Sequence, residues 1–194
     1  MDLLKTDNLQ YRELGGNYTY PLETPEGELL LFYRLGGAGG NSPLAVSRSG
    51  DRGTTWKAPR ILVDYGANHG SGSVKIRDAV YDPNTGRVHL VIDERDNSSK
   101  RARWYAHYCQ YEPAGDRMVA LNGADLGETA TRETLVDNDS RLPAAGDMAI
   151  RDGCVYLLMC KKTWILGIVE GGRLTCRELP SVQGTAQKVL FLAG

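Results

Sequence analysis

The stretch from Ser49 to Trp56, with the sequence S-G-D-R-G-T-T-W, constrains the fold more than any other part of this chain. The side chains of Ser49 and Asp51 can accept hydrogen bonds from the backbone N–H groups of a turn. Gly53 can adopt a positive φ angle without steric cost. We expect Thr54–Trp56 to restart a strand, with the indole ring supplying a large apolar surface for burial. The stretch predicts a β-hairpin in which Asp51 has a structural role and not a catalytic one.

Short apolar runs without helical periodicity recur along the chain. Three of them are Glu28–Tyr33, Arg87–Ile92 and Cys154–Met159, and each follows a turn that contains Gly together with Pro or Asp. Runs bounded in this way are typical of β-strands. The pattern of one such strand with its neighbours appears three times. A repeat of roughly 40–50 residues with four strands is typical of the blades of a β-propeller.

The fold class predicted from these repeats is all-β, a β-propeller of four-stranded antiparallel blades. We expect one partial propeller domain over residues 1–194, with blades at about 17–63, 73–135 and 147–179 and an incomplete fourth from 185. Propellers typically close with about four to eight blades. About three blades plus partial ones therefore predict an incomplete ring, completed by more sequence or by another copy. A smaller β-sandwich is the alternative fold.

The pattern S-x-D-x-G-x-T-W at Ser49, Asp51, Gly53 and Trp56 resembles the Asp-box of the BNR-repeat and sialidase-like β-propellers. In those families the Asp-box lies at the periphery of a blade, away from the substrate face. The resemblance therefore implies a structural role for these four residues.

A second resemblance covers roughly Gly15 to Leu126. The segments Y-T-Y-P and L-L-F-Y-R-x-G-x-x-G, followed by the Asp-box, look like the BNR-repeat polysaccharide lyases, a group that includes the ulvan lyases. In such lyases a tyrosine transfers a proton, and an arginine sixteen residues later neutralises the carboxylate of a uronic acid. Tyr18 and Arg34 have that spacing, and a two-stranded hairpin can bring both side chains to one rim. The resemblance implies that these two residues are catalytic.

The chemistry of uronate elimination gives both residue types a reason. The C5 proton of a uronate is weakly acidic while the neighbouring carboxylate is charged. A bidentate arginine stabilises the enolate that develops when this proton leaves. A tyrosine or histidine removes the proton or protonates the leaving oxygen. The alternatives are an ion pair at a sheet end for Arg34 and packing between blades for Tyr18. Tyr20 and Tyr33 take the place of Tyr18 if the strand faces the other way.

Other residues are candidates for substrate binding. Tyr20 adjoins the Tyr18 position, His69 lies in a loop between blades, and Arg77 lies on the expected first strand of the second blade. First strands meet at the axis of a propeller, which also makes inner-face candidates of Lys75, Asp78 and Asp147. The lyases that this chain resembles use histidines upstream of the tyrosine and arginine, and residues 1–16 contain no histidine. The resemblance therefore implies that the catalytic histidine is absent from this chain.

Two further histidines and four cysteines favour structural roles. His89 and His107 lie on expected strands, where we predict a hydrogen-bonded sheet histidine and a packed one. The three histidines lack the paired spacing of a metal site, so we predict no metal and no cofactor, with a structural calcium or zinc ion left open. No cysteine belongs to a C-x-x-C pair, and we expect all four to be core thiols. They are Cys109, Cys154, Cys160 and Cys176.

The net charge of −1 and the pI of about 6.3 indicate no nucleic-acid partner. No apolar run approaches the roughly 20 residues of a membrane span, and residues 1–10 show no apolar signal core. The family resemblance nevertheless suggests a secreted or periplasmic protein. The predicted partner is an acidic polysaccharide, with a homo-oligomer as one way to complete the ring.

Three functions are consistent with these features. The first is a polysaccharide lyase that acts on a uronate-bearing acidic polysaccharide by β-elimination, inactive alone if the upstream histidine is required. The second is a non-catalytic propeller that binds glycans or partner proteins. The third is a sialidase-like glycoside hydrolase, whose chemistry needs an arginine triad, a Tyr–Glu pair and an acidic Asp. The match to the sialidase R-I-P motif is Arg141-Leu142-Pro143, late in the chain.

Overall fold

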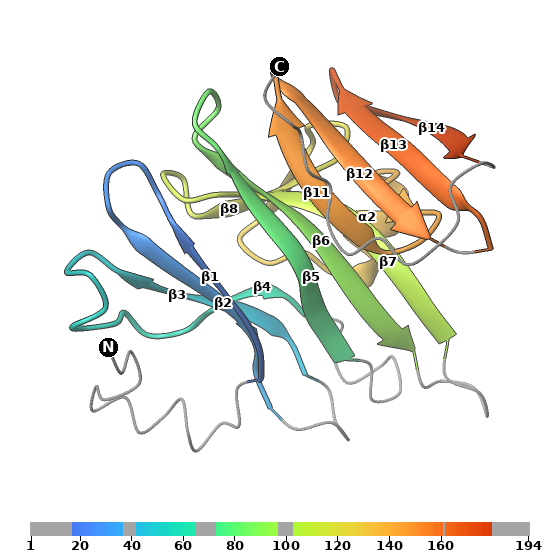
Figure 1. Ribbon diagram of the computed structural model, residues 1–194. Helices are drawn as coiled ribbons and strands as arrows, with labels where there is room; N and C mark the ends of the chain where they lie inside the picture. The colour runs from blue at the N-terminus through green and yellow to red at the C-terminus, as the bar shows by residue number, and fades with distance from the viewer. Residues whose placement is uncertain (1–16, 37–41, 65–72, 97–102, 161, 180–194) are drawn as a thin grey trace.

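The computed structural model describes residues 17–36, 42–64, 73–96, 103–160 and 162–179, and these form three antiparallel sheets that lie side by side (Figure 1). The first sheet has the order β1-β2-β3-β4. Its strands are β1 (Asn17–Glu23), β2 (Leu29–Arg34), β3 (Leu44–Ser49) and β4 (Arg60–Val63). The incomplete fourth blade predicted from residue 185 lies outside the described residues.

The second sheet has the order β5-β6-β7-β8-β9, and a sixth strand, β10, pairs with β7. The strands are β5 (Ser73–Asp82), β6 (Arg87–Asp96), β7 (Arg103–Glu112), β8 (Arg117–Ala120), β9 (Asp125–Gly127) and β10 (Arg141–Leu142). The connection between β9 and β10 holds the short helix α2 (Arg132–Asp137), which the sequence analysis did not predict. Its start is a capping box in which Thr131 and Thr134 each bond the backbone N–H of the other.

The third sheet repeats the simple four-stranded order β11-β12-β13-β14. Its strands are β11 (Gly146–Arg151), β12 (Cys154–Cys160), β13 (Trp164–Glu170) and β14 (Arg173–Leu179). The all-β prediction with four-stranded antiparallel units is confirmed, and the arrangement is that of part of a β-propeller.

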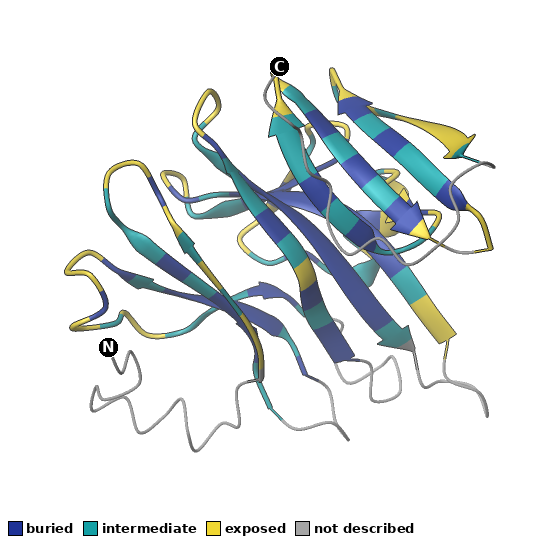
Figure 2. Cartoon of the chain, viewed as in Figure 1, coloured by how far each residue is buried: buried dark blue, intermediate teal, exposed yellow. Residues whose placement is uncertain are grey.

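Two apolar cores lie between the sheets. Buried and partly exposed residues alternate along β12, whereas β6 is buried along most of its length (Figure 2). The core between the first and second sheets includes Phe32, Leu44 and Leu90. The core between the second and third sheets includes Tyr108 and Leu157. Because each sheet buries apolar side chains against its neighbour, packing between sheets fixes where their first strands meet.

The turn between β3 and β4 forms the hydrogen bonds expected of it. Ser49 Oγ donates to the Asp51 carboxylate and accepts from the Gly53 N–H, both at 2.8 Å. The Asp51 carboxylate also accepts from the hydroxyl of Thr55 at 2.6 Å and from its N–H at 2.8 Å. These bonds, those from Thr55 above all, lower the pKa of Asp51 to about 2. Asp51 therefore stays ionised and holds the turn.

Two details of the sequence-based expectations are wrong. Thr54–Trp56 do not restart a strand, because the Asp51 carboxylate holds Thr55 in the turn, and β4 begins only at Arg60. The four thiols are all free, yet only Cys109 is fully buried, while Cys160 and Cys176 are exposed. Cys160 is the last residue of β12, and Cys176 lies on β14, the outermost strand of the third sheet among the described residues.

Candidate functional site

The first strands of the three sheets meet at Asp78. The hydroxyl of Tyr20 on β1 donates to one oxygen of this carboxylate, and the Met148 N–H on β11 donates to the other at 2.6 Å. Burial and the Asp78 hydrogen bond raise the pKa of the Tyr20 hydroxyl well above its ordinary value. A phenol held in this way is a poor proton-transfer group, so its contact with Asp78 favours a positioning role for Tyr20.

Tyr18 is presented by a β-bulge in β1. Asn17 pairs with Arg34 and Tyr20 pairs with Phe32, so two residues of β1 oppose one residue of β2. Tyr18 has a φ angle of 55°, a conformation that costs a non-glycine residue about 1–3 kcal/mol. The residue is 53% exposed. The bulge therefore turns the large aromatic side chain of Tyr18 outward. A regular strand would give this side chain another direction.

Arg34 is the last residue of β2 and lies beneath that ring. Its guanidinium carbon is 4.9 Å from the centre of the Tyr18 ring, and only 6% of the residue is exposed. Within the part of the chain that the structure describes, its Nε has no hydrogen-bond partner and the side chain forms no ion pair. A buried guanidinium that no described carboxylate neutralises is costly unless an anion completes it. Such a group can bind a carboxylate.

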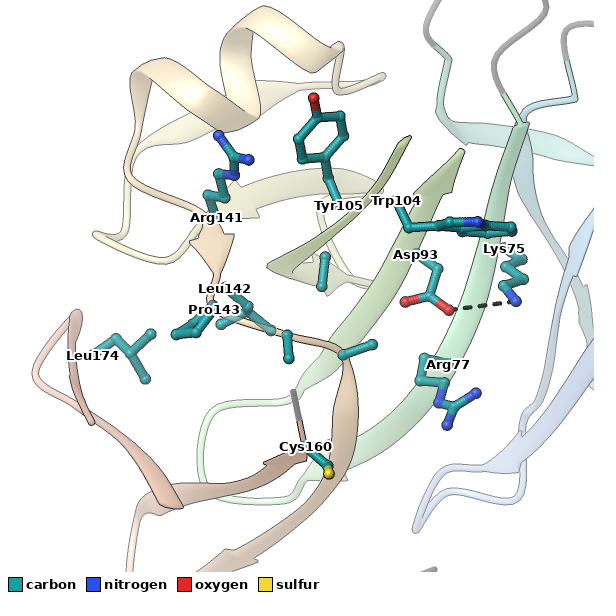
Figure 3. Close-up of a pocket in the computed structure, with 13 residues that line it drawn as sticks. Lys75, Arg77, Asp93, Trp104, Tyr105, Arg141, Leu142, Pro143, Cys160 and Leu174 are labelled. Carbon is teal, nitrogen blue, oxygen red and sulfur yellow. Dashed lines mark ion pairs between the residues drawn. The ribbon is translucent and has the colours of Figure 1, made fainter. Parts of the chain in front are cut away.

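Lys75, on β5 of the second sheet, places a second cation beside the Tyr18 ring. Its Nζ lies 5.2 Å from the centre of the Tyr18 ring and 4.7 Å from the centre of the Trp104 ring. It also forms an ion pair with the buried carboxylate of Asp93 at 3.4 Å, drawn as a dashed line in Figure 3. Lys75 therefore neutralises Asp93 and joins two exposed aromatic rings.

Arg77 occupies a second β-bulge, at the corresponding part of β5. Ile76 pairs with Ile92 and Asp78 pairs with Val91, which leaves Arg77 without a cross-strand partner. The side chain is exposed, and the described residues provide no carboxylate that pairs with it. Bulges commonly re-aim side chains beside functional sites. The first strands of the first and second sheets, β1 and β5, thus each present one side chain of this face from a bulge. These side chains are those of Tyr18 and Arg77.

Two cavities adjoin along this face. The smaller, of about 320 Å³, is lined by Tyr18, Thr19, Tyr20, Lys75, Ile76, Arg77 and Asp147. The larger, of about 770 Å³, lies between the second and third sheets (Figure 3). Its lining includes Lys75, Arg77, Asp93, Trp104, Tyr105 and Arg141. Lys75 and Arg77 line both, so we treat the two cavities as one groove.

The predicted site residues fall into three groups. Tyr18, Tyr20 and Arg77 line the groove, and Arg34 lies under Tyr18. His69 lies outside the described residues. Asp93 was not among the sequence candidates. It lies on β6, and only the pairing of β6 with β7 brings its side chain to the groove. Arg141 was considered for another reason, as part of the sialidase-like tripeptide.

The two described histidines are interior groups. His107 Nε2 lies 2.9 Å from a carboxylate oxygen of buried Glu94, whose other oxygen pairs with Arg132 at 3.1 Å. His89 Nδ1 is hydrogen-bonded to the Tyr108 hydroxyl, as predicted for a sheet histidine. Among the described residues no three His, Cys, Asp or Glu side chains are grouped so as to hold a metal ion.

His89 should make the stability of the fold depend on pH. Burial lowers its pKa from the ordinary value to about 4, so the unfolded chain binds a proton more readily than the folded one. The free energy of unfolding therefore falls as the pH drops through the window from about 6.5 to about 4. Between pH 7 and pH 5 the expected loss is about 2 kcal/mol.

Urea unfolding at these two pH values tests this expectation. The variant His89→Gln cannot take up the proton and should lose less stability over the same interval, whatever its stability at pH 7. An equal loss in the two proteins would show that His89 is not the group responsible.

The fold and the groove define a class of protein, a segment of β-propeller whose inner face is cationic and lined by aromatic rings. Within the described ranges no helix is long and apolar enough to cross a membrane. No protein-family model matches the chain, and no curated protein matches it.

Three solved structures with a similar fold are polysaccharide lyases. One is a PL25 ulvan lyase bound to -[GlcA(1-4)Rha3S]-, with 13% sequence identity and a TM-score of 0.64 over 83% of this chain and 43% of that chain. Another PL25 ulvan lyase structure has 14% identity and a TM-score of 0.66 over the same shares. The polysaccharide lyase Uly1 has 13% identity and a TM-score of 0.60 over 92% of this chain and 43% of that chain. The chain thus spans less than half the length of these structures, and the likeness shows the fold.

Proposed function

We propose that this chain is part of a polysaccharide-lyase-like propeller that binds a uronate-bearing acidic polysaccharide in the groove. The observation that carries the proposal is the buried guanidinium of Arg34, whose Nε has no partner among the described residues and which lies 4.9 Å from the exposed ring of Tyr18. Arginine binds a carboxylate in a planar, bidentate geometry, and an aromatic ring offers a face to a sugar. The similar fold of ulvan lyases supports the same substrate class.

The reaction we assign to this groove is β-elimination. A base takes the C5 proton of the uronate, the electron pair forms the C4–C5 double bond, and the C4–O bond breaks. The leaving oxygen takes up a proton. Arg34 stabilises the negative charge that develops on the carboxylate as C5–H breaks. Tyr18 transfers a proton, because its exposed hydroxyl-bearing ring stands over the carboxylate site.

One feature of the groove favours binding without turnover as the second candidate. No histidine is among the described residues that line either cavity, so this part of the lining supplies no imidazole as a general base. Two exposed aromatic rings, of Tyr18 and Trp104, are in contrast well placed to stack on sugar rings. A chain that holds the substrate but lacks the base would bind ulvan and leave it intact.

Incubation of the chain with ulvan and with other uronate polysaccharides tests the proposal. The ultraviolet absorbance of an unsaturated uronate should rise with the wild-type chain and stay flat with Arg34→Met. Binding that depends on Arg34 without any rise in absorbance would support the second candidate. Absence of both binding and absorbance on all uronate substrates would overturn the proposal, and release of sialic acid from a sialoside would support the sialidase-like alternative.

A further inference from the structure

Three aspartates of the described chain stand in or beside the groove, and they differ in their surroundings. Both carboxylate oxygens of Asp78 accept hydrogen bonds from neighbouring first strands. The Asp93 carboxylate is paired with Lys75 and lines only the larger cavity. Asp147 lines the smaller cavity together with Tyr18. Among the residues that the structure describes, Asp147 therefore supplies the one carboxylate in the wall of that cavity.

The place of Asp147 on β11 explains why its side chain reaches the cavity. Successive side chains of a strand point to opposite faces. Met148 is buried in the core between the second and third sheets, so Asp147 points away from that core. Asp147 pairs with Leu158 of β12, which fixes the backbone behind it, and the residue is half-buried. The carboxylate is thus held on the wall that the third sheet contributes to the cavity.

The first strands of the three sheets contribute different chemical groups to the smaller cavity. β1 contributes the phenols of Tyr18 and Tyr20, β5 contributes the cations of Lys75 and Arg77, and β11 contributes Asp147. Burial and a hydrogen bond are the main causes that raise the pKa of the Tyr20 hydroxyl, and the negative charge of Asp147 adds to them. The Asp147 carboxylate therefore lies within electrostatic reach of the phenols of β1.

We propose that Asp147 is the general base of this groove and removes the C5 proton of the uronate. The inference rests on the proposed function, because it names the base that β-elimination needs. A carboxylate is a sufficient base for a proton beside a carbonyl group when other groups stabilise the enolate. Arg34 has that stabilising role in the proposed reaction.

The C5–H bond breaks, and its proton moves to a carboxylate oxygen of Asp147, which becomes a neutral carboxylic acid. The electron pair of the C5–H bond forms the C4–C5 double bond, and the C4–O bond breaks with its electron pair on the leaving oxygen. Tyr18 donates its phenolic proton to that oxygen. Water then carries the proton from the Asp147 acid to the Tyr18 phenolate, which returns both groups to their starting states.

Replacing Asp147 with asparagine keeps the shape of the side chain and removes the base. Asp147→Asn should lower kcat for the formation of unsaturated uronate by about 10²–10⁴-fold, the usual contribution of a general base. KM and the calorimetric affinity for ulvan should stay within about threefold of the wild-type values, because only the transition state needs the base. Asp152→Asn is the matched control on the turn after β11 and should equal the wild-type chain. The Asp152 carboxylate is 88% exposed, and asparagine tolerates its φ angle of 52°.

Two further measurements separate a base from a carboxylate that only supports the fold. Asp147→Ala leaves space for a small acid, so added formate should restore part of the lost turnover, which it could not do for a misfolded chain. In D₂O the wild-type chain should exchange the C5 proton of an oligosaccharide whose terminal uronate lacks the 4-oxygen and so cannot eliminate. NMR follows this exchange, and Asp147→Asn should lose it.

These measurements distinguish failure of the base assignment from failure of the proposed function. Wild-type kcat in Asp147→Asn, or C5 exchange that survives this substitution, would overturn the assignment. Ulvan binding that depends on Arg34, with neither exchange nor turnover by the wild-type chain, would overturn the assignment and leave the binding proposal standing. Absence of binding to every uronate polysaccharide would overturn both.

Discussion

Replacing Arg34 with methionine is expected to weaken the binding of uronate oligosaccharides strongly while leaving the fold equally stable or more stable. Removing one partner from a desolvated, hydrogen-bonded charge pair costs about 2 kcal/mol or more, which corresponds to a loss of affinity of roughly 30-fold or greater. The opposite effect on stability follows from the free protein. Its guanidinium is 6% exposed and finds no ion-pair partner within the described residues.

The physical reason is that a buried charge without an anion is unfavourable. An apolar side chain of similar length removes that cost and keeps the packing below Tyr18. Sites built to bind a charged ligand often reduce the stability of the free protein in this way. A structural arginine would behave differently, because its replacement would remove favourable contacts and lower the free energy of unfolding.

Two measurements on the same variant distinguish these cases. Calorimetric titration with a uronate oligosaccharide gives the affinity, and urea unfolding gives the stability. Arg177→Gln removes a cation of the exposed edge strand and should match the wild-type chain in both. A methionine variant that is clearly destabilised and still binds uronate would show that Arg34 supports the fold and not the ligand.

Replacing Glu94 with alanine should have the largest effect on stability. The Glu94 side chain is 3% exposed and bridges His107 of β7 and Arg132 of α2. Removing one member of a buried ion pair typically costs about 3–5 kcal/mol. The loss here includes the contact with buried His107 and the ion pair with Arg132. Loss of this carboxylate therefore also loosens the attachment of α2 to the second sheet.

The free energy of unfolding in urea measures this effect. Glu94→Gln keeps a hydrogen-bond acceptor and should be destabilised less than Glu94→Ala, which gives a second reading if the alanine variant is poorly folded. Glu128→Ala removes a carboxylate that is 88% exposed and 3.7 Å from Arg60. It should show only the small change of an ordinary surface substitution. Equal stability of Glu94→Ala and the wild-type chain would contradict the structural role assigned to this triad.

Local signals in the sequence were sufficient for the strands and their hairpins. Turns such as Asp82–Gly86 contain residues that bond their own backbone, and the apolar runs between turns have the length of strands. The hairpin of β1 and β2 also brought Tyr18 and Arg34 together, as the pairing of adjacent strands requires. These features depend on residues that are close in sequence, so they could be predicted without a tertiary structure.

Features that depend on contacts between sheets could not be predicted. The bulge at Tyr18 appears only in the register with β2, and the left-handed φ angle of a tyrosine has no signal in the sequence. Asp93 and Trp104 face one cleft with Arg141 because β6, β7 and β10 pair around it. The exposure of Cys160 likewise depends on where the third sheet ends. Each of these is decided by partners far away in the chain.

The most direct test of the account compares two ligands on two proteins. The ligands are a uronate oligosaccharide and the same oligosaccharide with its carboxylates reduced to alcohols, and the proteins are the wild-type chain and Arg34→Met. If Arg34 binds the carboxylate, reduction should weaken binding to the wild-type chain by roughly 30-fold or more and should change binding to the variant far less. An equal loss in both proteins would contradict the account, because the carboxylate would then be recognised at a place other than Arg34.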